Sequence, residues 1–123
     1  MGSAPLIAIV DDDEAVRRGL TRLLKSAGYV AGAFGSAETF LRSGRLPLSR
    51  AVILDLRMPG MTGLKMQRHL ATAGHRMPVI ILTAHGDQEA RRQALEAGAI
   101  AFLRKPFDAE ELLGALASAL RGQ

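Results

Sequence analysis

Short apolar runs alternate with amphipathic segments along the chain. The apolar runs are LIAIV (6–10), YVAGAF (29–34), AVILDL (51–56), PVIILT (78–83) and IAFL (100–103). These runs are nearly continuous rather than alternating, which is typical of strands buried on both faces of a parallel sheet. We therefore expect five buried strands.

The segments between the runs carry helical periodicity and helix-terminal residues. The first helix is predicted by apolar residues at helical spacing, ended by a glycine: Val16, Leu20, Leu23, Leu24, Ala27 and then Gly28. Ser36 is expected to cap a short second helix, and the third and fourth are predicted over 64–73 and 88–97. Asp108 and Glu111 have the spacing of a capping box that begins the last helix.

This alternation predicts an α/β fold with one doubly wound (βα)5 parallel sheet, helices on both faces and right-handed crossovers. The 123 residues fit a single domain. The start MGS is typical of an expression tag, so residues 1–4 are expected to be a tag remnant or a disordered N-terminus. The predicted domain then covers 5–121.

Composition narrows the classes of function. The chain has no cysteine, so it offers no disulfide and no thiolate metal site, which fits a cytoplasmic protein. No apolar run approaches the roughly 20 residues of a membrane span. The net charge of +4 comes from arginines that are scattered singly or in pairs, and the aromatic residues are few. Solvated helix faces therefore explain the charge better than a nucleic-acid surface.

Polar residues follow the predicted strands at the edge where parallel sheets bind ligands. Asp11 and Asp12 end the first strand, Asp55 the third and Thr83 the fourth, and the fifth runs into Lys105. Carboxylates bind hard divalent cations such as Mg²⁺. A carboxylate can also attack phosphorus to form an aspartyl phosphate, with positive groups neutralising the developing charge. Asp13 and Glu14 are expected only to begin the first helix.

Four motifs, in this order and spacing, resemble the receiver domain of two-component response regulators. They are IVDDDE (9–14), LDLRMPGMTG (54–63), ILTAHGD (81–87) and LRKPF (103–107), and they look most like the FixJ-type subgroup. The resemblance covers about residues 5–121. It implies the flavodoxin-like receiver fold with strand order 2-1-3-4-5.

The resemblance also implies a role for each matching residue. Asp55 is the expected phosphoacceptor. Asp11 and Asp12 are expected to bind Mg²⁺, or Mn²⁺ in its place, together with Asp55 and the backbone carbonyl of Arg57. Asp12 is the more direct of the first two ligands.

The remaining matching residues are expected to sense the phosphoryl group. Thr83 hydrogen-bonds it and moves when it arrives, and the rotamer of Phe102 follows as the aromatic switch. Lys105 pairs with a phosphoryl oxygen and is joined to Pro106 by a cis peptide. His85 is more simply an exposed loop residue than one that alters phosphoryl lifetime.

The expected function is that of a phosphorylation-switched signalling module. A sensor histidine kinase or a phosphotransfer protein supplies the phosphoryl group. The surface of the fourth helix, fifth strand and fifth helix then changes, often to form a homodimer. Enzymatic activity is limited to self-phosphorylation and self-dephosphorylation. The homodimer is expected to control a transcription output domain that is not part of this chain, and DNA is expected to be contacted only through that domain. The alternative is a stand-alone receiver that binds proteins or acts as a phosphate sink.

Two other classes are weaker. A haloacid-dehalogenase-like phosphatase needs a second aspartate two residues after its nucleophile, where this chain has Arg57. A flavodoxin-like flavin or nucleotide binder needs a glycine- or hydroxyl-rich phosphate loop after the first strand. The sequence there is DDDEAVRRG, whose four acids repel a phosphate. A pseudo-receiver is disfavoured because the acceptor, metal, threonine and lysine positions are all intact.

Overall fold

The computed structural model describes residues 4–84 and 87–122, so His85 lies outside the described residues. Within them the chain forms five strands, and all neighbouring strands are parallel in the order β2-β1-β3-β4-β5. The strands are β1 (Leu6–Val10), β2 (Val30–Phe34), β3 (Ser49–Leu54), β4 (Val79–Thr83) and β5 (Ala101–Arg104). The predicted doubly wound fold and strand order are confirmed.

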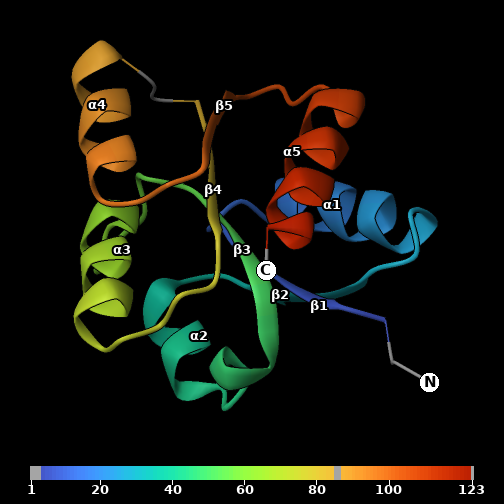
Figure 1. The fold of residues 1–123 in the computed structure, drawn as a ribbon, viewed down its shortest axis with the longest axis horizontal. Coiled ribbons are helices and arrows are strands. Elements are labelled where there is room, and N and C mark those ends of the chain that lie inside the picture. Colours follow the sequence, from blue (N-terminus) through green and yellow to red (C-terminus); the bar gives the residue numbers. More distant parts are fainter. Residues whose placement is uncertain (1–3, 85–86, 123) are drawn as a thin grey trace.

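The described residues form five α-helices, of which the first four connect successive strands and the last follows β5: α1 (Glu14–Ser26), α2 (Ala37–Arg42), α3 (Gly63–Thr72), α4 (Gln88–Glu96) and α5 (Ala109–Arg121). Helices α1 and α5 cover one face of the sheet, while α2, α3 and α4 cover the other (Figure 1). A short 3-10 helix, Leu46–Leu48, precedes β3 and was not predicted. Asp108 accepts backbone N–H groups as the N-cap of α5, as predicted, and Asp13, which was expected only to begin the first helix, is the N-cap of α1.

Each face of the sheet has its own apolar core. Phe40, Met66 and Leu70 pack between the sheet and α2–α4. Leu20 and Leu112, from α1 and α5, pack on the opposite face. The central strands β1, β3 and β4 are almost entirely buried, because helices cover both of their faces.

The expectation of full burial is wrong for the two edge strands. Only Gly32 of strand β2 is buried, and Val30 is 47% exposed. Strand β5 is also only partly buried. An edge strand has a neighbour on one side only, so its side chains receive less cover from the sheet and from the helices above it.

The third strand is displaced from its predicted bounds in a way that matters for the site. The run AVILDL predicted a strand over 51–56, but β3 ends at Leu54. Asp55 is therefore the first residue after the strand, at the carboxyl edge of the sheet. Among the described residues, no helix is both long and apolar enough to cross a membrane.

Candidate functional site

Three predicted site residues meet at the carboxyl ends of the strands because the sheet continues one residue beyond each strand. The Asp11 amide donates to the Phe34 carbonyl (3.1 Å), and the Asp55 amide donates to the Val10 carbonyl (3.0 Å). The Lys105 amide donates to the Thr83 carbonyl (3.0 Å). Backbone hydrogen bonds therefore fix the starting point of each of the three side chains.

The ammonium of Lys105 joins the two buried carboxylates. Its Nζ lies 2.7 Å from Asp11 Oδ2 and 2.9 Å from Asp55 Oδ2. The other oxygens accept backbone amides, Asp11 Oδ1 from Asp13 (2.9 Å) and Asp55 Oδ1 from Arg57 (3.2 Å). Asp11 and Asp55 are only 2% and 5% exposed, so both carboxylates are shielded from water and held by fixed donors.

Burial and charge act in opposite directions on this cluster. Burial raises the pKa of Asp11 above its usual value, although the hydrogen bond from Lys105 works against the rise. For Lys105, burial alone would lower the pKa. The hydrogen bonds to Asp11 and Asp55 outweigh burial, and the pKa of Lys105 is raised. Lys105 is thus a cation at neutral pH and offsets part of the carboxylate charge.

The same carboxylates fit a hard divalent cation. Asp11, Asp12 and Asp55 each offer an oxygen, and these oxygens lie within 4.8 Å of one another. Asp12 is exposed, so an ion can reach the cluster from solvent. Three carboxylates against one ammonium leave an excess of negative charge, and all the donors are oxygens, as Mg²⁺ and Mn²⁺ prefer. The Arg57 carbonyl lies in the same turn as the Arg57 amide, which already donates to Asp55 Oδ1.

Thr83 and Phe102 lie on the same face of the sheet. Thr83 is the last residue of β4 and is fully buried. Phe102 pairs in register with Ile81, which is two residues before Thr83 and therefore points to the same side. Phe102 is partly buried against the core under α2–α4. The Lys105–Pro106 peptide is cis.

Three residues near the site had no role in the sequence interpretation. Arg17 of α1 donates from Nη1 to the Asp11 carbonyl (2.8 Å). Glu38 of α2 accepts the Met61 amide (3.1 Å). A Cβ on Gly63 would lie 2.2 Å from the Asp55 carbonyl oxygen, so only glycine fits there. Gly63 is the last residue of the quoted LDLRMPGMTG motif, but its neighbour in space could not be read from the sequence.

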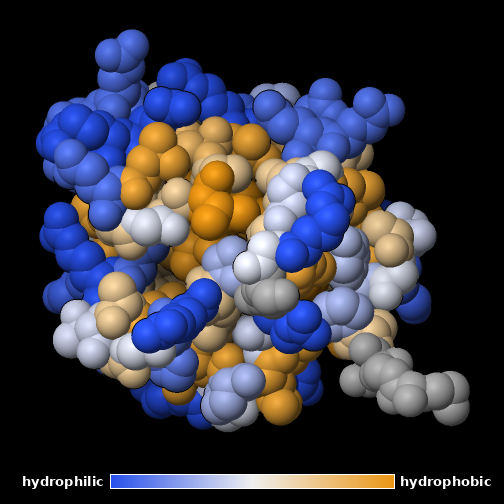
Figure 2. All heavy atoms as spheres, viewed as in Figure 1, coloured by the Kyte–Doolittle hydropathy of each residue, from blue (hydrophilic) through white to orange (hydrophobic). Residues whose placement is uncertain are grey.

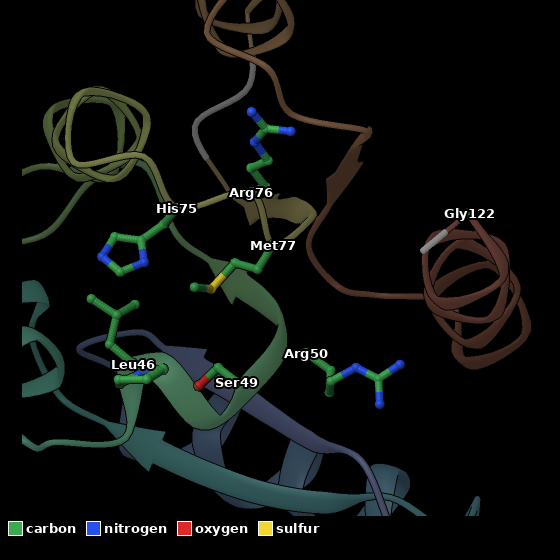
Figure 3. A pocket seen from close by; sticks show the side chains of 8 residues that line it. Leu46, Ser49, Arg50, His75, Arg76, Met77 and Gly122 are labelled. Atoms are coloured by element: carbon green, nitrogen blue, oxygen red, sulfur yellow. The ribbon is translucent and has the colours of Figure 1, made fainter.

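A cavity of about 490 Å³ lies at the opposite edge of the sheet and contains none of the predicted site residues. Its lining includes Leu46, Arg50, His75 and Met77, from the segments that enter β3 and β4 (Figure 3). The lining has no carboxylate. This cavity therefore does not offer the carboxylate chemistry described above.

The parallel sheet and its acidic carboxyl edge define a receiver domain, and comparison with known proteins identifies the family. The family described as response regulator receiver domain matches residues 7–117. The chain belongs to this family and is the receiver domain of a two-component response regulator. Receiver domains are signalling modules that generally bind Mg²⁺ in an acidic pocket.

Several individual members of the family are similar to this chain. The response regulator TodT of Pseudomonas putida F1 is 43% identical over 118 residues, which are 96% of this chain and 52% of TodT. The transcriptional regulatory protein FixJ of Azorhizobium caulinodans is 40% identical over 115 residues, 93% of this chain and 54% of FixJ. A solved structure titled FixJ-N has a TM-score of 0.87 at 34% identity and covers 100% of this chain and 98% of its own. The chain thus spans about half the length of these curated relatives.

Proposed function

We propose that Asp55 accepts a phosphoryl group in a Mg²⁺-dependent reaction. The observation that carries the proposal is the bridge of Lys105 between Asp11 and Asp55, at 2.7 and 2.9 Å. It brings a nucleophile, a cation and a second carboxylate together at one strand edge. The donor is a phosphohistidine of a sensor kinase or of a phosphotransfer protein, in keeping with the family.

In the transfer, a carboxylate oxygen of Asp55 forms a bond to phosphorus while the bond from phosphorus to the donor nitrogen breaks. The electron pair of the broken bond stays on that nitrogen. The hydrogen bond from the Arg57 amide to Asp55 Oδ1 orients the carboxylate. Lys105, already 2.9 Å from Asp55 Oδ2, moves to a phosphoryl oxygen and neutralises charge there.

The metal would be held by Asp11, Asp12, Asp55 and the Arg57 carbonyl. When bound, it supplies charge neutralisation for the transferring group. Without it, the negative charge of Asp11 and Asp12 repels an incoming phosphoryl group. The acid cluster therefore makes the site depend on a divalent cation.

The switch proposed for this chain joins Thr83 to Phe102. The Thr83 hydroxyl turns to the phosphoryl group, and Phe102, on the same face of the sheet, turns inward into the space that Thr83 leaves. Support comes from the burial of Thr83 and from Phe102, which lies on the same face of the sheet and is only partly buried.

The responding surface is that of α4, β5 and α5, and we propose that it forms a homodimer after phosphorylation. Apolar surface gathers between α4 and α5 over the last strands (Figure 2). Strand β5 is an edge of the sheet, and Ile100 just before it is 47% exposed. FixJ is named a transcriptional regulatory protein. By analogy, the dimer would control a transcription output domain, through which any DNA contact would be made.

The test is phosphorylation by acetyl phosphate with Mg²⁺, followed by intact mass. We expect one acid-labile phosphoryl group on the wild type and none on Asp55→Asn or on wild type treated with EDTA. Labelling of Asp55→Asn equal to that of the wild type would overturn the proposal. A rapid release of phosphate from small phosphomonoesters would favour a phosphatase instead.

A further inference from the structure

The loop from Asp55 to Thr62, between β3 and α3, carries two of the proposed metal ligands. Its two ends are fixed. The Arg57 amide binds Asp55 Oδ1 (3.2 Å), and the Gly63 amide donates to the Leu56 carbonyl (2.9 Å). The middle of the loop is held from outside. The Met61 amide donates to Oε2 of Glu38, a residue of α2 that is 23 positions earlier in the chain.

Gly60 is shaped for this contact. Its φ is +77°, a conformation that favours glycine, and a Cβ at this position would lie 2.5 Å from Glu38 Oε2. The carboxylate therefore occupies the space in which any other residue would place its side chain. A side chain here would have to displace the Glu38 carboxylate from the loop.

Apolar packing joins the same two segments. Met58 is 7% exposed and lies in one core cluster with Ala37 and Phe40 of α2. Met61 packs against that cluster as well. Helix α2 thus supports the loop in two ways. It packs against the methionine side chains of the loop, and its Glu38 accepts a backbone amide of the loop.

The Glu38 carboxylate has an uneven environment. Oε2 accepts from Met61, while Oε1 is buried without a hydrogen-bond partner among the described residues. An unpaired polar atom in such a place is unfavourable. The backbone amides of Glu38 itself and of Met61 lower the pKa of its carboxyl group, so it is the ionised form that binds the loop. A glutamate at this position is explained by what it does for the loop.

We propose that Glu38 is a positioning residue for the metal site. By holding the amide of Met61, it fixes the middle of the loop, and with it the Arg57 carbonyl and the Asp55 carboxylate. The inference rests on the proposed function, because it assumes that these two groups bind Mg²⁺. Glu38 is not one of the proposed ligands and acts only through the Met61 amide.

Three variants test this role. Glu38→Ala removes the acceptor, and Glu38→Gln keeps an acceptor oxygen without the charge. Glu110→Ala is the matched control, because Glu110 occupies the same second position of helix α5, on the opposite face of the sheet. Each protein is titrated with Mg²⁺ alone, without a phosphodonor. Amide hydrogen exchange of Met61 is measured in parallel, and thermal unfolding shows that each variant is folded.

We expect Glu38→Ala to bind Mg²⁺ about tenfold more weakly, the loss typical of residues that orient metal ligands. Its Met61 amide should exchange faster, Glu38→Gln should regain most of the affinity, and Glu110→Ala should match the wild type. Wild-type affinity in Glu38→Ala, or equal losses in Glu38→Ala and Glu38→Gln, would overturn the role of Glu38. Absence of Mg²⁺ binding in the wild type would instead overturn the proposed function on which the role depends.

Discussion

At the scale of single residues, the consecutive aspartates after β1 have three different environments. Asp11 is buried and paired with Lys105, Asp12 is exposed at the cation cluster, and Asp13 caps α1. Residue type alone could not separate them. Their positions separate them, since Asp11 follows the end of the strand and Asp13 precedes the helix. Side chains at successive positions along this turn point in different directions.

This division predicts opposite effects for two neighbouring alanine variants. Asp12→Ala should weaken Mg²⁺ binding severely while the metal-free protein stays as stable as the wild type or becomes slightly more stable, since a repelling charge is removed. Asp13→Ala should lose about 1 kcal/mol of stability, because its carboxylate accepts the amides of Ala15 and Val16. Its Mg²⁺ affinity should change little.

Urea unfolding without metal, combined with Mg²⁺ titration, separates the two effects. If Asp12→Ala were the less stable variant and Asp13→Ala the one deficient in Mg²⁺ binding, the assignment of roles would be wrong.

Gly63 gives the sharpest steric prediction at this scale. A Cβ there would lie 2.2 Å from the Asp55 oxygen and 2.8 Å from the Leu56 Cα, both backbone atoms. Gly63→Ala must therefore displace the acceptor loop, and we expect a loss of about 3 kcal/mol. The control Gly114→Ala, in α5 with nothing within 4 Å of the added carbon, should instead gain about 0.5–1 kcal/mol. Equal urea midpoints for the two variants would contradict the close approach.

At the scale of elements, the hydrophobic pattern predicted the strands and helices but not how the edges of the sheet are covered. Central β1, β3 and β4 matched the expected burial, because apolar runs determine how a strand between two helical layers is packed. The run YVAGAF looked equally buried, yet Val30 is exposed on edge strand β2. Position in the sheet depends on long-range pairing, which an apolar run does not encode.

A buried glutamine links two helices on the same face. Gln67 of α3 is 2% exposed, and its Nε2 donates to the Ala94 carbonyl of α4 (3.1 Å). Its Oε1 has no partner among the described residues. That carbonyl also accepts the Ala99 amide (3.0 Å), so it stays satisfied without Gln67.

Gln67→Met should therefore be neutral or stabilise the protein by up to about 1 kcal/mol. The lost hydrogen bond is worth about 1 kcal/mol, and removal of the unpaired oxygen returns at least as much. Urea unfolding measures the difference, with Gln93→Met on α4, which is less buried, as a surface comparison. A loss of stability above about 1.5 kcal/mol in Gln67→Met would show that Oε1 does have a hydrogen-bond partner.

At the scale of the whole molecule, the site could be predicted to the extent that it depends on strand ends. Asp11, Asp55 and Lys105 were expected together because parallel strands end at one edge. Glu38 and Arg17 were not, since each binds a backbone group whose position depends on how a helix packs against a distant loop. Isolated charges on helices gave no signal for such contacts.

The proposed surface over β5 predicts a change in assembly. Beryllofluoride with Mg²⁺, which mimics a phosphoryl group on an aspartate, should shift the wild type from monomer to dimer in gel filtration with light scattering. Asp55→Asn should remain a monomer, and Ile100→Glu, which places a charge on the exposed apolar surface, should weaken the dimer. A wild type that stays monomeric with beryllofluoride bound would count against this surface.

The central claim is that Asp55 is the phosphoacceptor and that the neighbouring acids make the reaction depend on metal. The most direct measurement treats the acetyl-phosphate-labelled protein with borohydride, which reduces an aspartyl phosphate to homoserine, and locates that residue by peptide mass spectrometry. The account predicts homoserine at position 55 in samples with Mg²⁺ and at no position in samples with EDTA. Homoserine at position 11 or 12, or at position 55 regardless of metal, would contradict it.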